Sequence, residues 1–69
     1  MKNTMNERYK KEIVIALSDR LEKLWDLSDK YSKEGETDKY NECYDEIYLI
    51  KEIANEYHID FDDRIASRF

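Results

Sequence analysis

The residue types that most often perform chemistry are scarce in this 69-residue chain, which has one histidine, His58, and one cysteine, Cys43. Nucleophilic catalysis needs a nucleophile, a base and an orienting group within hydrogen-bonding distance. These two side chains are fifteen residues apart, which corresponds to ~22 Å along a helix. We therefore expect no Cys–His dyad within one chain. We expect Cys43 to be a small, buried and reduced residue, with a redox or interchain role as the alternative.

The segment His58-Ile59-Asp60-Phe61-Asp62-Asp63 superficially resembles a metal-binding loop. It lacks the glycine and the distal glutamate of a calcium loop, and only its histidine is a good transition-metal ligand. We interpret the segment as a turn between helices in which aspartates act as helix caps. No metal, cofactor or catalytic site is expected, and the residues do not indicate an enzyme.

One enzyme family is kept as a remote alternative. Asn41-Glu42-Cys43-Tyr44-Asp45 loosely resembles the Ser-Gln-Glu-Leu-Asp signature in the second helix of short helical-hairpin phosphatases, which act on aspartyl-phosphate response regulators. The segment lacks the serine and the leucine of that signature, and it lies about one turn closer to Gly35 than in the family. The resemblance implies an aspartyl-phosphate phosphatase built on a helical hairpin.

Carboxylates are the stronger chemical signal, because 17 acidic residues against 12 basic ones give a net charge of −5. Carboxylates three or four positions apart share one helix face and stand ~4.5–6 Å apart along its axis. Phosphates along one DNA strand have a similar spacing. Tyr44 and Tyr48 are expected to be exposed beside the acids, and tyrosine is favoured at interfaces. The expected partner-binding residues are Glu42, Asp45, Glu46, Tyr48, Glu52 and Glu56, with Asp19, Glu22 and Asp26 as a second row.

Such a surface predicts a basic protein partner and disfavours direct binding to nucleic acid, whose phosphates would repel it. The expected function is that of an inhibitor or antirepressor that occupies the basic groove of a nucleic-acid-binding protein as a DNA mimic. A phage or mobile-element origin would suit such a protein. The alternative is a structural or regulatory hairpin that binds a partner helix through an apolar stripe. The acids of the first helix also allow a plainer interpretation as solvated charge, since Arg20, Lys23 and Lys30 lie among them.

The elements that position these residues follow from a symmetry in the sequence. Apolar or small residues recur at helical spacing on both sides of Gly35. Antiparallel helices joined there would bring together the pairs Tyr31/Tyr40, Ser28/Cys43, Leu24/Ile47, Leu21/Ile50, Leu17/Ala54 and Val14/Tyr57. We therefore predict one all-α domain over residues 1–69: an antiparallel helical hairpin with helices over about 5–34 and 38–57, and a short helix over about 61–68.

Several residues are typical of helix ends. Thr4-Met5-Asn6-Glu7 fits a capping box at the start of the first helix. Gly35 suits the left-handed residue that ends this helix. Thr37 or Asp38 is the expected cap of the second helix, and Asp60 is the expected cap of the third.

The first predicted helix is longer than the second, so its amino-terminal end should extend past the hairpin. Antiparallel packing then brings the acidic segment 60–63 beside Arg8, Lys10 and Lys11, and we expect an attraction between them. The longest apolar run, residues 13–17, is too short to span a membrane, and we expect a cytoplasmic protein.

The six pairs form one line of contact between the two helices, which we call the seam. Apolar side chains outside the seam are left without a partner, and a small domain often gains stability by oligomerisation. We therefore expect a homodimer that covers the residues off the seam, chiefly Trp25, Leu27, Tyr48, Leu49 and Ile53.

Overall fold

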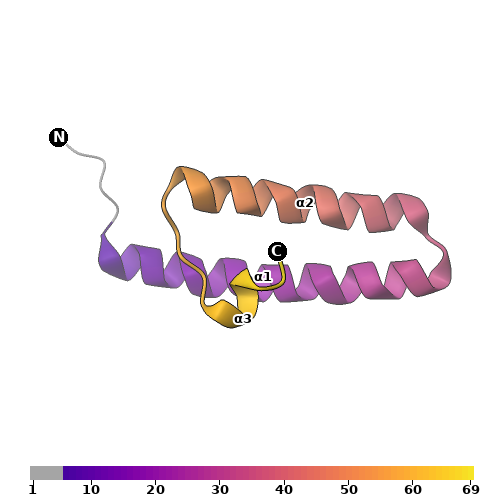
Figure 1. The fold of residues 1–69 in the computed structure, drawn as a ribbon, viewed down its shortest axis with the longest axis horizontal. Coiled ribbons are helices and arrows are strands. Elements are labelled where there is room, and N and C mark those ends of the chain that lie inside the picture. Colours follow the sequence, from indigo (N-terminus) through magenta and orange to yellow (C-terminus); the bar gives the residue numbers. More distant parts are fainter. Residues whose placement is uncertain (1–5) are drawn as a thin grey trace.

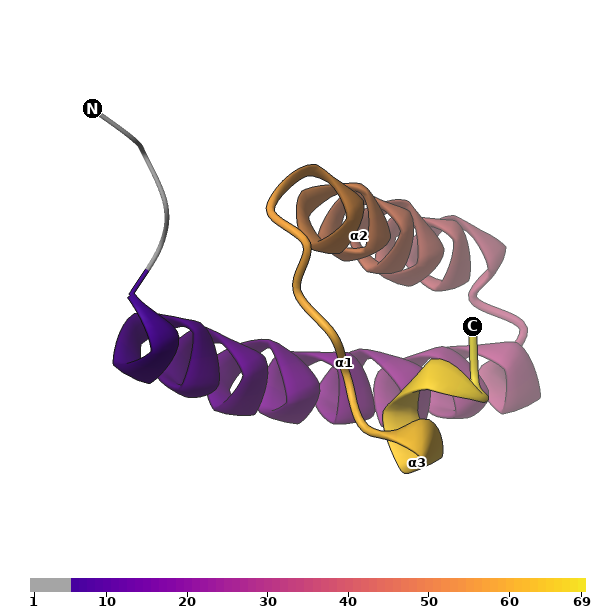
Figure 2. The same cartoon turned by 60° about the vertical axis from the view of Figure 1, so that its left-hand side comes forward.

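A computed structural model describes residues 6–69, which form three helices (Figure 1). α1 spans Glu7–Glu34, α2 spans Thr37–Glu56 and α3 spans Asp63–Ala66. α1 and α2 pack side by side and run antiparallel, while α3 lies on one face of this hairpin (Figures 1 and 2). The predicted all-α hairpin with a short third helix is confirmed, although α3 has only 4 residues.

Gly35 ends α1 as predicted. Its φ of 74° lies in the left-handed region, where a residue without a Cβ atom is favoured. Its backbone N–H donates to the Ser32 carbonyl at 3.2 Å, and the N–H of Glu36 donates to the Tyr31 carbonyl at 2.9 Å. These bonds use carbonyl groups that the end of the helix leaves free, so the chain can reverse at once.

The start of α1 differs in detail from the prediction. Asn6 is the N-cap, and its side-chain oxygen accepts a hydrogen bond from the backbone N–H of Arg8 at 2.7 Å. Asparagine is among the strongest N-cap residues, so this contact alone suffices to begin the helix. The predicted capping box used Thr4, which lies outside the described residues.

The predicted caps of the other two helices are wrong. Glu36 is the N-cap of α2, without a side-chain cap bond, because the connection after Gly35 is so short that Thr37 and Asp38 are already helical. Asp62, rather than Asp60, caps α3 and accepts a hydrogen bond from a backbone N–H at 3.2 Å. The chain stays non-helical until residue 62, and the burial of Ile59 ties this stretch to the hairpin.

The core is a single cluster between the two long helices and the carboxyl-terminal segment. Three of the predicted seam pairs, Ser28/Cys43, Leu24/Ile47 and Leu21/Ile50, consist entirely of buried residues. The outermost pair does not belong to the core, because Tyr57 follows the last residue of α2 and is 54% exposed. The buried cluster comprises Leu21, Leu24, Trp25, Cys43, Ile47, Ile50 and Ile65.

Trp25 is covered within the chain rather than left for a dimer. Its ring meets the ring of Phe69 edge to face, with 5.6 Å between centroids, and the guanidinium of Arg68 lies 4.3 Å from its centroid. Ile65 of α3 is fully buried in the same cluster, and Phe61 packs against it. The expectation that Trp25 needs a second subunit is therefore wrong, because the carboxyl-terminal segment folds back over it.

Candidate protein interface

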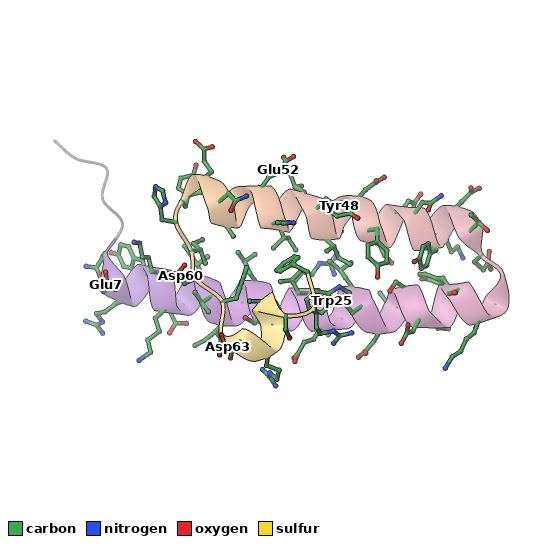
Figure 3. All side chains as sticks on the ribbon, in the orientation of Figure 1. Glu7, Trp25, Tyr48, Glu52, Asp60 and Asp63 are labelled. Atoms are coloured by element: carbon green, nitrogen blue, oxygen red, sulfur yellow. The ribbon has the colours of Figure 1, made fainter. Side chains whose placement is uncertain are left out.

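The side of α2 that faces away from α1 carries three exposed carboxylates: Asp45, Glu52 and Glu56. Figure 3 shows Glu52 on this side of the helix. Helical spacing places Asp45 about two turns from Glu52, and Glu56 about one turn beyond it. Among residues 6–69, none of the three forms an ion pair. This row, which we call the acidic row, is therefore unneutralised within the described chain.

Glu46, a fourth expected member, does not point away from the rest of the chain. One of its carboxylate oxygens accepts a hydrogen bond from Nε of Arg20 at 2.8 Å and lies 2.8 Å from Nη2 of the same guanidinium. The two side chains are 48% and 40% exposed, so the pair bridges α1 and α2 at the surface. Arg20 reaches across to α2 instead of pairing along its own helix, so Glu46, unlike the acidic row, already meets a cation of its own chain. Glu42 is exposed as expected.

Three tyrosines at four-residue spacing form a ladder along α2. The ring centroids of Tyr40 and Tyr44 are 5.1 Å apart, and those of Tyr44 and Tyr48 are 6.2 Å apart. The neighbouring Tyr44 raises the pKa of the Tyr40 phenol, with a smaller contribution from burial. Tyr44 is half-buried against the core, contrary to the expectation that it is exposed, whereas Tyr48 is 58% exposed. The ladder thus ends in one accessible ring beside the acidic row (Figure 3).

The second expected row lies on α1 among cations. Asp19, Glu22 and Asp26 line a shallow hollow together with Arg20 and Lys23. Glu22 also pairs with Arg64 of α3 at 3.4 Å. The local field of this row is therefore weaker than that of the acidic row on α2.

A basic cluster lies near the amino-terminal end of α1. Arg8, Lys10 and Lys11 of α1 line a hollow of about 690 Å³ together with Asp60, but within residues 6–69 no ion pair joins Asp60 to these cations. Asp62 and Asp63 do not line this hollow. The first is held in the cap of α3, so only part of the predicted acidic segment reaches the basic end.

The two residues with nucleophilic or proton-transfer chemistry are kept apart. Cys43 lies in the buried cluster, and burial raises the pKa of its thiol. His58 is exposed in the turn after α2, with a φ of 55° in the left-handed region. Nothing in the sequence indicated this conformation, because glycine is the residue that marks such positions. Within residues 6–69, no group of three or more His, Cys, Asp or Glu could hold a metal ion, and no helix is long and apolar enough to cross a membrane.

The fold and the surface define a class: a helical hairpin, closed on one face by a short third helix, with an acidic outer side. Comparisons were made with protein families, curated proteins and solved structures. No protein-family model, no curated protein and no solved structure matches the chain.

Proposed function

We propose that this protein is an acidic binding module whose acidic row occupies the basic groove of a nucleic-acid-binding protein. One observation carries the proposal. Asp45, Glu52 and Glu56 are exposed on one side of α2 without ion pairs among residues 6–69, and Tyr48 is exposed beside them. A charged row alone is compatible with solvation, but an accessible aromatic ring beside it is typical of an interface.

A groove that binds nucleic acid presents arginine and lysine side chains to phosphates. Carboxylates on a rigid helix can take the place of those phosphates, because arginine binds both groups through the same planar fork of N–H donors. Tyr48 adds apolar area, and its ring face attracts cations of the partner. Lys39 already lies over the ring of Tyr31 in this way, 5.6 Å from its centroid.

The charge distribution favours α2 over α1 as the binding element. Six carboxylates and two lysines give α2 a net charge of −4. α1 carries seven acidic and seven basic residues and is neutral overall. Long-range attraction of a basic partner, which accelerates association, therefore originates mainly from α2.

The test reverses the charge of two exposed members of the acidic row that form no ion pair among residues 6–69. Asp45→Lys/Glu52→Lys should leave the far-ultraviolet circular dichroism unchanged, because both side chains are exposed. Immobilised protein is used to capture partners from a lysate, and captured proteins are identified by mass spectrometry. We expect nucleic-acid-binding proteins, captured less as salt rises and displaced by their own nucleic acid. The double variant should reduce this capture chiefly by slowing association.

Asp19→Lys/Asp26→Lys is the matched control, since it makes the same change in charge on the outer side of α1. Its effect on capture should be the smaller of the two, because Arg20 and Lys23 share that surface. The proposal would be overturned if the two double variants captured the partners to the same extent. Capture that does not respond to salt would also overturn it.

A further inference from the structure

The hairpin has one face that α3 does not cover. α3 and the residues after it lie on one side of the hairpin (Figures 1 and 2), and Phe69 contacts Trp25 and Lys51 there. On the opposite side, the Arg20–Glu46 pair joins the two long helices. Helical spacing places a set of apolar residues on that side, between this ion pair and the start of α1. We call the set the open face: Tyr9, Ile13, Ala16, Leu49, Ile53 and Tyr57.

The open face gathers exposed apolar side chains from both long helices. Tyr9, Leu49 and Tyr57 are 66%, 53% and 54% exposed. These three account for half of the large apolar side chains that are exposed among the described residues. Exposed apolar side chains that share one face are a feature of binding surfaces.

We propose that a second copy of this chain covers the open face, with α1 of each copy packed antiparallel on α2 of the other. The two-fold axis then runs parallel to the long helices, and the open faces of both copies meet along their whole length. Each helix gains an antiparallel neighbour from the other copy, which is the arrangement of a four-helix bundle. The inference does not rest on the proposed function, because Asp45 and Glu52 lie outside the open face.

Charge selects this orientation over the other two-fold arrangement of the same faces. With the axis perpendicular to the helices, α2 would pack on α2, and two helices of net charge −4 would lie side by side. Like charges placed together across an interface disfavour the complex. With the axis parallel to the helices, each α2 instead meets an α1 of net charge zero. Arg20 of one copy then also approaches Glu46 of the other, so the two ion pairs at the border of the open faces become a network.

The side of the hairpin that α3 leaves uncovered has room for a dimer interface. The molecule measures 49 × 21 × 16 Å, and α3 lies over only one of its two broad sides. The whole of the other broad side, including the surroundings of the Arg20–Glu46 pair, projects to about 1,000 Å². This upper limit exceeds the ~800 Å² per partner of a standard interface. The dimer would thus add apolar burial to a chain whose length alone gives marginal stability.

The first test measures the mass of the whole protein in solution by sedimentation or light scattering. The wild-type chain should have about twice its 8.4 kDa mass at micromolar concentration. Leu49→Lys should give the single-chain mass, because it places a charge within the open face. Ile15→Lys is the matched control: its aliphatic side chain is 52% exposed, close to the 53% of Leu49, but lies outside the open face. This control should remain a dimer.

The second test reports the orientation and does not depend on how well Leu49→Lys folds. In a Cys43→Ser background, Ala16→Cys and Ile53→Cys are prepared as separate single-cysteine proteins and oxidised alone or mixed. Ala16 of one copy faces Ile53 of the other in the proposed dimer, so a disulfide-linked dimer should form only in the mixture.

A wild-type protein of single-chain mass would overturn the proposal. So would a dimer that persists in Leu49→Lys, since its interface would then lie elsewhere. Efficient disulfide formation by Ala16→Cys alone would place α1 on α1 and would refute the proposed orientation.

Discussion

The two long helices end in the same way but with different residues, and this difference can be measured as stability. At the end of α1, Gly35 has a φ of 74°, and the next N–H bonds back to the Tyr31 carbonyl. After α2, His58 has a φ of 55°, and the N–H of Ile59 donates to the Ala54 carbonyl at 2.9 Å. For a residue with a Cβ atom, the left-handed conformation costs ~1–2 kcal/mol. Gly35→Ala should therefore destabilise the protein, and His58→Gly should stabilise it.

The magnitudes follow from the surroundings of each residue. A methyl group added at Gly35 would meet no atom within 4 Å, so Gly35→Ala loses the backbone term of ~1–2 kcal/mol. Alanine also removes ~0.5–1 kcal/mol of disorder from the unfolded chain, which leaves a net loss of ~0.5–1 kcal/mol. His58→Gly gains the same term but adds ~0.5–1 kcal/mol of disorder to the unfolded chain, which leaves a net gain of ~0.5–1 kcal/mol. A change of 1 kcal/mol shifts the Tm of a domain of this size by ~4–8 °C. Urea and thermal unfolding at one fixed protein concentration, followed by circular dichroism, resolve both effects.

His58→Ala is the control for the imidazole ring. It keeps the left-handed backbone and removes the ring, so its free energy of unfolding should stay close to that of the wild type. If His58→Gly and His58→Ala both destabilise the protein, the ring makes contacts that outweigh the backbone strain, and the reasoning is refuted. A neutral Gly35→Ala would refute the backbone argument for both helix ends.

Three further changes probe the core. Leu21→Ala should lower the free energy of unfolding by ~2.7–5 kcal/mol, because the side chain is 0% exposed. Urea denaturation measures this loss, and a loss below about 1 kcal/mol would contradict the prediction. Phe69→Ala should shift the fluorescence of Trp25 to longer wavelength, since it uncovers the indole ring; an unchanged spectrum would show that Arg68 and α3 suffice to cover it. The contribution of Cys43 to stability should be constant below pH ~8.5 and should decline above it, because the unfolded state loses the thiol proton first while burial raises the pKa in the folded state. Cys43→Ser should remove that decline, and a wild-type slope retained in this variant would assign it to other groups.

The hairpin was predictable because its seam depends on periodicity alone. Leu21, Leu24, Ile47 and Ile50 recur at the spacing of one helix face, and Gly35 is the sole glycine between them. Antiparallel packing buries both stripes, and the short connection at Gly35 between the two helices selects this register. The same logic failed at Tyr57, where α2 has already ended and the side chain turns to solvent.

The surface was less predictable, because it depends on how neighbouring elements cover each flank of the hairpin. Arg20 has acidic residues near it on its own helix, yet it pairs with Glu46 across the seam. Trp25 lies beside the seam, and its burial depends on where the chain turns after α2. Propensity and periodicity describe single helices. The Arg20–Glu46 pair depends instead on how two helices pack, and the burial of Trp25 depends on the path of a connection without regular structure.

Four consecutive residues of α2 show how closely the faces of this helix are divided. Ile50 is buried in the seam, and Lys51 extends over the ring of Phe69 on the covered flank, 5.9 Å from its centroid. Leu49 is exposed on the open face, and Glu52 belongs to the acidic row (Figure 3). Because each residue turns the helix by about 100°, deletion of one residue upstream in α2 would carry Lys51 into the seam in place of Ile50. A change in the helical register of α2 therefore alters the residues of the core, the open face and the acidic row at the same time.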